Sequence, residues 1–218
     1  MVTAAPQNAA CSGTTGFTSR PSDALHGRAA LSADVKPVVP EQAEFCGVAV
    51  PCHAGPADNL AVFAALPLIQ PSDVIVAATD GYRETAIVGD LVLGMARNLG
   101  AVAFVTDGCV RDIPGIRDVG LPCFATGVTP NSPVKNGPGT VNLPIVLAGA
   151  SVAPGDVVIG DADGVVVIPF DNIDLVIARL EKVRAAEASL VARLAEGLGV
   201  PEWVRKLHAE GRVQEVDE

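Results

Sequence analysis

The sequence predicts an α/β domain followed by C-terminal helices, and three observations support this fold class. Short runs rich in Val and Ile, bounded by Gly, Pro and Asp, recur through the first 170 residues and indicate buried strands. Two segments between these runs carry apolar residues at spacings of three and four, which is typical of helices packed on a sheet. A longer, charged helical pattern follows Phe170.

The elements are expected in the following order. Residues 1–19, rich in Ala, Thr, Ser and Gly without periodicity, are expected to form a flexible tail. Residues 20–170 are expected to form the α/β domain, with strands at 45–52, 73–79, 102–108, 121–127, 143–149, 156–161 and 164–169 and helices at 58–69 and 89–100. Residues 171–218 are expected to be helical, with a long helix at 172–197 and a short one at 201–211 opened by Pro201.

The stretch Asp161-Ala162-Asp163-Gly164 has two interpretations. Its spacing of aspartates resembles the start of a calcium loop, but the oxygen ligands that such a loop needs downstream are missing. Asp-Gly between two Val-rich runs is a strong signal for a hairpin turn. The sequence therefore favours a β-hairpin here.

Composition excludes some classes of function. The 218 residues are 49% hydrophobic, which is enough to bury a core. A net charge of −10 and a pI near 4.7 argue against nucleic-acid binding through phosphates, so small-molecule or protein partners are expected. No apolar run approaches about 18 residues and the N-terminus has no basic, apolar leader, so neither a membrane span nor a secretory signal is predicted. A cytoplasmic location is expected.

The five cysteines have no CxxC spacing and are odd in number, so we expect no zinc knuckle and expect reduced thiols. Cys52 beside His53 suggests a nucleophile and its base. However, neighbouring residues on a strand point to opposite faces of the sheet. A structural role for Cys52 is therefore the favoured interpretation.

A candidate anion site lies at the start of the predicted helix 89–100. Gly89 and Asp90 begin this helix, so the backbone N–H groups of Leu91 and Val92 lack intrahelical acceptors. They lie at the positive end of the helix dipole, where a carboxylate can bind.

Arg111 and Asp112 follow the next predicted strand, which in a parallel sheet ends at the edge where α/β proteins bind ligands. An arginine suits a carboxylate or a carbonyl oxygen that gains charge, and an aspartate suits a hard divalent cation. Together they are typical of a site for a 2-oxo acid on a metal. A loop salt bridge, with Asp90 as a helix N-cap worth about 1 kcal/mol, explains the same spacing.

Asp90, twenty intervening residues, Arg111 and Asp112 reproduce a D-x20-R-D signature. With it, the sequence resembles the family of 4-hydroxy-4-methyl-2-oxoglutarate/4-carboxy-4-hydroxy-2-oxoadipate aldolases and the regulator of ribonuclease E activity A. The likeness covers residues 20–170 and includes "ADNLAVFAAL", "PSDVIVAATDG", "GLPCFATGVTP", "NGPGTVNLPIVLAG" and "PGDVVIGDADGVVVIP". The C-terminal helices resemble the aldolase branch.

This resemblance implies a swivelling β/β/α domain in a homotrimer or a dimer of trimers, with active sites between subunits. It also implies a metal-dependent aldolase that releases pyruvate from a 2-oxo acid substrate, with oxaloacetate decarboxylase activity expected alongside. The alternative from the same family is a non-catalytic protein that binds and inhibits an RNA-processing enzyme.

The resemblance also implies roles for individual residues. Asp112 would ligate Mg²⁺ or Mn²⁺, and Arg111 would polarise the C2 carbonyl of the substrate and stabilise the enolate. Asp90 would hold a metal-bound or catalytic water. The amides of Leu91 and Val92, after Gly89, would bind the pyruvyl carboxylate.

Two further positions bear on the resemblance. Glu187 resembles a glutamate of the aldolase branch that reaches a neighbouring subunit's site, although a solvated helix glutamate explains it equally well. Gly115 stands where some aldolases of the family have an acidic residue, which leaves the substrate preference open.

A Schiff-base lysine is the other chemical route to the same cleavage. The four lysines lie in predicted polar loops or charged helices, where nothing desolvates the amine: Lys36, Lys135, Lys182 and Lys206. The metal route is therefore the predicted one.

Overall fold

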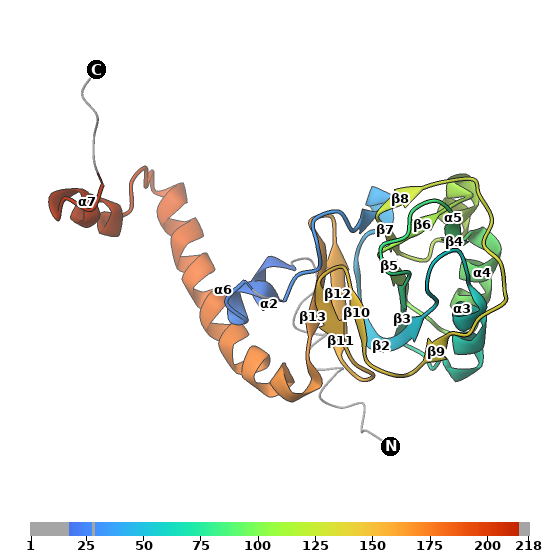
Figure 1. The fold of residues 1–218 in the computed structure, drawn as a ribbon. Coiled ribbons are helices and arrows are strands. Elements are labelled where there is room, and N and C mark those ends of the chain that lie inside the picture. The colour runs from blue at the N-terminus through green and yellow to red at the C-terminus, as the bar shows by residue number, and fades with distance from the viewer. Residues whose placement is uncertain (1–17, 28, 214–218) are drawn as a thin grey trace. The chain divides into compact units, whose positions relative to one another are not determined.

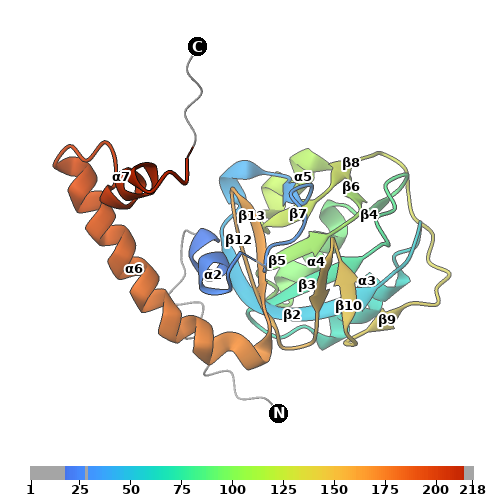
Figure 2. The same ribbon diagram turned by 60° about the vertical axis from the view of Figure 1, so that its left-hand side comes forward.

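The computed structural model describes residues 18–27 and 29–213. The chain divides into two compact units, the first ending at Leu180 and the second beginning at Glu181. The first unit is a mixed α/β domain, and a helical extension follows it (Figures 1 and 2). The predicted fold class is confirmed.

The main sheet has the strand order β1-β7-β5-β3-β2-β12-β13, with β9 also paired to β2. Strands β7, β5, β3 and β2 are parallel, whereas β12 pairs antiparallel with β2 and β13. All six residues of β3 are buried, which is typical of a parallel strand covered on both faces. The strands are β1 (Lys36–Pro37), β2 (Phe45–His53), β3 (Asp73–Ala78), β5 (Ala103–Thr106), β7 (Cys123–Ala125), β9 (Thr140–Val141), β12 (Val157–Asp161) and β13 (Gly164–Ile168).

A second, three-stranded parallel sheet lies at the carboxyl ends of the main parallel strands. It consists of β4 (Ala86–Val88), β6 (Cys109–Val110) and β8 (Gly127–Val128). These strands follow β3, β5 and β7 along the chain, respectively. Strands β10 (Ile145–Leu147) and β11 (Ala150–Val152) form a separate antiparallel hairpin.

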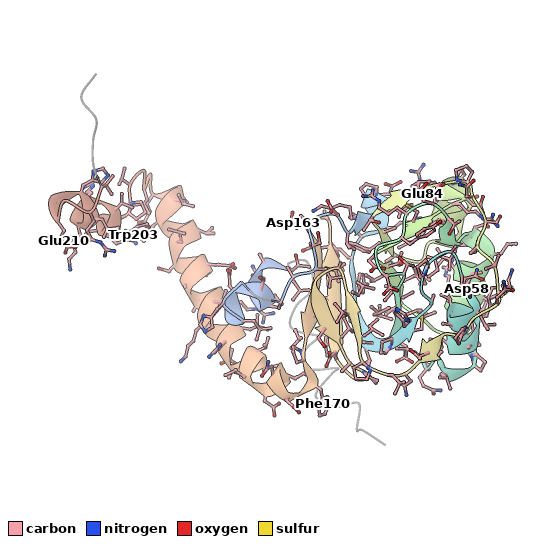
Figure 3. The ribbon with its side chains drawn as sticks, in the orientation of Figure 1. Asp58, Glu84, Asp163, Phe170, Trp203 and Glu210 are labelled. Atoms are coloured by element: carbon pink, nitrogen blue, oxygen red, sulfur yellow. The ribbon has the colours of Figure 1, made fainter. Side chains whose placement is uncertain are left out.

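Helices α3, α4 and α5 cover one face of the main sheet, and the β10–β11 hairpin covers the other (Figure 1). The chain leaves β13 through a short helix η3 at Phe170, labelled in Figure 3. The helices are α2 (Ser19–Ala24), η1 (Pro40–Gln42), α3 (Leu60–Ala65), η2 (Leu66–Leu68), α4 (Asp90–Asn98), α5 (Ile113–Val119), η3 (Phe170–Asn172), α6 (Ile173–Ala195) and α7 (Glu202–Ala209).

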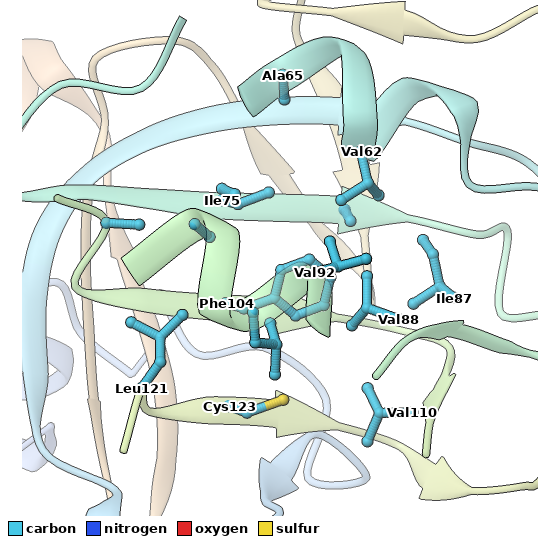
Figure 4. Packing of buried hydrophobic residues seen from close by; sticks show 14 of the residues in the cluster. Val62, Ala65, Ile75, Ile87, Val88, Val92, Phe104, Val110, Leu121 and Cys123 are labelled. Carbon is cyan, nitrogen blue, oxygen red and sulfur yellow. The ribbon is translucent and has the colours of Figure 1, made fainter. Parts of the chain in front are cut away.

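The core beneath the three helices is continuous with the second sheet. Val62 of α3 and Val92 of α4 pack on Ile75 and Phe104 of the main sheet (Figure 4). Val88 of β4 belongs to the same cluster. Burying these apolar side chains stabilises the fold and also holds the start of α4 against the sheet.

The structure bears out the predicted hairpin at residues 161–164, because β12 and β13 pair with Asp161 opposite Gly164. Asp163 lies at the tip of this hairpin (Figure 3).

Helix α5 was not predicted, because Pro114 and Gly115 in its first turn hide the helical pattern. Proline is tolerated there, since the first turn needs no N–H donor.

The structure also bears on the expectations about the N-terminal tail, membrane spans and the cysteines. Residues 1–17 of the expected tail lie outside the described residues, whereas Ser19 begins α2. Within the described ranges, no helix is both long and apolar enough to cross a membrane. Cys46 is disulfide-bonded, which corrects the expectation of reduced thiols at that position.

Two glycine-to-alanine substitutions are expected to change the free energy of unfolding in opposite directions. A Cβ at Gly160 would lie 2.1 Å from a Phe45 ring atom, so we expect Gly160→Ala to lower the free energy of unfolding by about 1–3 kcal/mol. At Gly94, inside α4, the nearest atom would be 3.8 Å away, so Gly94→Ala should raise it by up to about 1 kcal/mol. Denaturant titration measures both. Equal stability of the two variants would contradict the described contact.

Candidate functional site

The pairing of β4 with β6 brings two distant parts of the chain together. Ala86 lies opposite Cys109 and Val88 opposite Val110. The amide of Arg111 then donates to the Val88 carbonyl at 3.1 Å. As a result, the start of α4 lies beside the start of α5.

Gly89 and Asp112 touch at this junction. A Cβ at Gly89 would lie 2.4 Å from Oδ2 of Asp112, so only glycine leaves room for this carboxylate. Asp112 itself has a φ of 62°, in the left-handed region that non-glycine residues rarely adopt. Such strained residues cluster at functional sites.

Asp90 meets α5 through a second glycine. A Cβ at Gly115 would lie 2.3 Å from Oδ2 of Asp90, so the absence of a side chain at this position makes room for the carboxylate. The other oxygen, Oδ1, accepts a hydrogen bond from the Leu91 amide at 2.8 Å. Asp90 is therefore held at the first turn of α4 with one oxygen toward α5.

The guanidinium of Arg111 has two side-chain partners. Its Nε lies 3.2 Å from Oδ2 of Asp112, and its Nη1 donates to Oγ of Ser132 at 2.5 Å. The Arg111 and Asp112 side chains are 37% and 49% exposed. An ion pair this exposed contributes little to stability.

These groups line a cavity of about 250 Å³. Six of the seven predicted site residues meet there: Gly89, Asp90, Leu91, Val92, Arg111 and Asp112. The seventh, Glu187, lies on α6 within the second compact unit and is not among the lining residues. The expectation that the helix start and the Arg-Asp pair share one sheet edge is confirmed.

Four polar or aromatic residues at the cavity were not predicted: Asn59, Phe63, Ser132 and Lys135. Asn59 is 4% exposed, and its Nδ2 donates to the Ile87 carbonyl at 2.9 Å. Its Oδ1 is buried without a hydrogen-bond partner. Lys135 Nζ lies 5.5 Å from the centre of the Phe63 ring. The loop around Lys135 carries no periodic signal that could have placed it.

The oxygen donors here suit a hard divalent cation. Magnesium is commonly held by one or two carboxylates, with waters and substrate oxygens completing its shell. Asp90 and Asp112 offer two carboxylates, each fitted against a glycine. Within residues 18–27 and 29–213 no cluster of three or more His, Cys, Asp or Glu side chains could hold a metal. A cation at this cavity would therefore depend on water or substrate for much of its shell.

Cys52 and His53 do not form a nucleophile and base. Cys52 is fully buried, and burial raises the pKa of its thiol to about 12. His53 is partly exposed, and its Nε2 lies 2.8 Å from Oδ1 of Asp80. The two side chains thus face different surroundings, as their alternation on β2 predicts.

Comparison with known proteins gives consistent similarities. The family model RraA-like, described as Aldolase/RraA, matches residues 18–167. A Halalkalibacterium halodurans protein named "Putative 4-hydroxy-4-methyl-2-oxoglutarate aldolase" is 41% identical over 164 residues, 75% of this chain and 78% of that protein.

Solved structures have the same fold. An uncharacterised protein from Pseudomonas syringae pv. tomato superposes with a TM-score of 0.76 at 23% identity, over 91% of this chain and 96% of that chain. The RNA-processing inhibitor RraA from Thermus thermophilis superposes with a TM-score of 0.64 at 27% identity, over 72% and 94%.

The buried thiols allow a direct test. Burial raises the pKa of both Cys52 and Cys123 to about 12, so at pH 8 the reactive thiolate is scarce at either position. We expect neither residue to be alkylated in the native protein and both to be alkylated after denaturation, as measured by peptide mass spectrometry. Rapid native labelling of Cys52 would revive the nucleophile interpretation.

Proposed function

The chain belongs to the RraA-like family (Aldolase/RraA), and from this premise we propose that it is a divalent-metal-dependent aldolase. The proposed substrates are 4-hydroxy-2-oxo diacids such as 4-hydroxy-4-methyl-2-oxoglutarate or 4-carboxy-4-hydroxy-2-oxoadipate. The products are pyruvate and a second oxo acid. One observation carries the proposal: Asp90, Arg111 and Asp112 line a single cavity.

The proposed cleavage breaks the C3–C4 bond of the substrate. The C4 hydroxyl loses its proton and becomes a carbonyl, and the bonding electron pair moves to C3 and is delocalised onto the C2 oxygen as an enolate. Protonation at C3 then gives pyruvate. The protein must therefore stabilise negative charge at the C2 oxygen and accept a proton near C4.

Arg111 is proposed for the first task. Its guanidinium has fixed partners on two sides, so it can meet the developing oxyanion with little reorganisation. Asp90 is proposed for the second, since it lines the same cavity and its carboxylate would hold a water that takes up the proton. Mg²⁺ or Mn²⁺ held by Asp112 would add Lewis-acid polarisation of the 2-oxo group.

The start of α4 is the proposed binding site for the substrate's C1 carboxylate. The Leu91 amide already donates to Asp90 Oδ1, so a bound carboxylate would have to share or replace that bond. Binding there would also release Asp90 Oδ1 for contact with water. Substrate binding and the freeing of Asp90 would in this way be coupled.

Two further proposals follow from the family. The same enolate forms when oxaloacetate loses carbon dioxide, so decarboxylase activity is proposed alongside aldol cleavage. A homotrimer or dimer of trimers is proposed, with Glu187 of a neighbouring subunit at the site. Leu91 and Met95, 75% and 47% exposed beside the cavity, offer apolar surface for such an interface.

A second candidate function is inhibition of an RNA-processing enzyme without catalysis. It is favoured by the likeness to the RNA-processing inhibitor from Thermus thermophilis and by the net charge of −10. A purely binding role makes no use of the strained Asp112 or of the two carboxylates fitted against glycines. For this reason the aldolase is the first proposal.

Pyruvate release from a panel of 4-hydroxy-2-oxo diacids and oxaloacetate tests the proposal, measured with Mg²⁺, with Mn²⁺ and with a chelator. Metal-dependent release from at least one compound is expected. Failure on every compound by a folded, metal-loaded protein would favour the inhibitor. Chelator-resistant activity that borohydride abolishes in the presence of substrate would instead point to a Schiff base on Lys135.

Arg111→Lys separates catalysis from a salt bridge. The variant keeps the charge but loses the planar fork, so turnover should fall by about a hundredfold, or about 3 kcal/mol, while the melting temperature barely changes. Steady-state kinetics and thermal denaturation measure the two effects. Turnover within a fewfold of wild type would mean that the pair is only structural.

Asp112→Asn should act through metal affinity. The substitution removes the anionic oxygen that a hard cation prefers, so activity should fall at low metal and be partly recovered at high Mg²⁺ or Mn²⁺. A metal titration of activity measures this shift. Loss of activity that no metal concentration relieves would argue against the assigned role.

A further inference from the structure

Residues 131–137, here called the strap, contribute Ser132, Pro133 and Lys135 to the lining of the cavity. One end of the strap is hydrogen-bonded to the first residue of β4 and to the segment before it. The Ala86 amide donates to the Asn131 carbonyl at 2.9 Å, and Asn131 Nδ2 donates to the Glu84 carbonyl at 2.8 Å. The strap has no helix. At its middle the Val134 amide donates to the Ala57 carbonyl at 2.8 Å, and the Val134 carbonyl accepts from the Asn59 amide at 3.0 Å. Beyond this bridge, its other end has a further anchor.

Asp58 is that anchor. Its Oδ2 accepts hydrogen bonds from the amides of Asn136 and Gly137, at 2.6 and 2.8 Å. Its Oδ1 accepts from the Leu60 amide at 2.7 Å, at the first residue of α3. The side chain lies beside α3 (Figure 3) and is 8% exposed. One carboxylate thus joins the strap to the helix.

The charge state of Asp58 supports a firm attachment. Burial raises the pKa of the carboxyl, but the amides of Leu60, Gly137 and Asn136 and the nearby charge of Lys135 outweigh it. The net pKa lies below the ordinary aspartate value. Asp58 is therefore ionised at neutral pH, and its hydrogen bonds are charge-assisted.

The strap connects Asp58 to the cavity through one side chain. Ser132 Oγ accepts from Arg111 Nη1, while Asp112 holds Nε of the same guanidinium. Ser132 is exposed and belongs to no helix or strand, so its position depends on the attachments of the strap at Asn131, at Val134 and at Asp58. Asp58 is also the residue opposite Val134 in the bridge, so loosening its attachment would give Ser132 more freedom beside the guanidinium.

We propose that Asp58 is a positioning residue of the site, which holds the strap so that Ser132 fixes the orientation of Arg111. Asp58 touches no substrate in this role and acts only through Ser132. The inference rests on the proposed aldolase function for its kinetic readout. Its structural readout is independent of any activity.

Asp156 provides a matched control. It is likewise buried, at 5% exposure, and accepts backbone hydrogen bonds from the amides of Ala153 and Phe170 at 2.8 and 2.9 Å. It does not line the cavity. Asp156→Asn should therefore reproduce any general loss of stability that Asp58→Asn causes, without the effect on the site.

The kinetic experiment compares Asp58→Asn, Ser132→Ala, their combination and Asp156→Asn in the full chain. Asp58→Asn and Ser132→Ala should each lower kcat by about tenfold with KM within about threefold, because a misdirected Arg111 affects the transition state more than binding. The double variant should be no worse than the worse single one, since both act by one route. Asp156→Asn should keep kcat within twofold.

Unchanged kcat per folded molecule in Asp58→Asn, or multiplicative effects in the double variant, would overturn the proposal. If Asp58→Asn fails to fold, the kcat of Ser132→Ala tests the proposal instead. A wild-type kcat in Ser132→Ala would count against the proposal. If the wild-type protein is inactive on every substrate, the proposed aldolase function fails. NMR of the same variants still tests whether Asp58 positions Ser132 and Arg111. The proposal is supported if Asp58→Asn, but not Asp156→Asn, shows faster amide exchange at Asn136 and Gly137 together with a shifted or broadened Arg111 Nε signal. An Arg111 Nε signal that does not change in Asp58→Asn overturns the proposal.

Discussion

The site depends on the backbone pairing of β4 with β6. This pairing brings the start of α4 beside Arg111, twenty-one residues after Asp90 in the sequence. The strands are three and two residues long, so their hydrogen bonds alone are weak. Val88 and Val110 add burial, since both belong to the core under α3, α4 and α5 (Figure 4). The geometry of the site is in this sense a consequence of hydrophobic packing one layer below it.

The carboxylates at the junction of α4 and α5 fit there because two glycines have no side chain. Gly89 and Gly115 leave space for the carboxylates of Asp112 and Asp90, respectively, and a methyl group at either position would overlap an oxygen. Asp112 additionally adopts a left-handed backbone conformation, which costs on the order of 1 kcal/mol or more and persists only where the surroundings enforce it. The chain thus accepts local strain where two carboxylates and Arg111 converge. A loop salt bridge needs no such arrangement.

Periodicity and turn chemistry were enough to predict the fold class, the helix at Asp90 and the β12–β13 hairpin, because these depend on local pattern. The sheet-edge rule was enough to place Arg111 near that helix. Helix α5 was missed because Pro114 in its first turn interrupts the pattern. Lys135 and Ser132 were missed because the strap is held by the Asp58 carboxylate and by the backbone bridge at Val134. These contacts span more than seventy residues, and no local pattern encodes them.

The proposed function requires that this cavity stabilise the enolate of a 2-oxo acid with the help of a divalent metal. Exchange of the pyruvate methyl protons for deuterium tests this requirement, because exchange needs the enolate and no knowledge of the natural substrate. Proton NMR of pyruvate in D₂O with the wild-type protein should show the methyl signal decaying with Mg²⁺ or Mn²⁺ and persisting with a chelator. A decay no faster than in buffer, with folded and metal-loaded protein, would mean that the cavity does not stabilise the enolate.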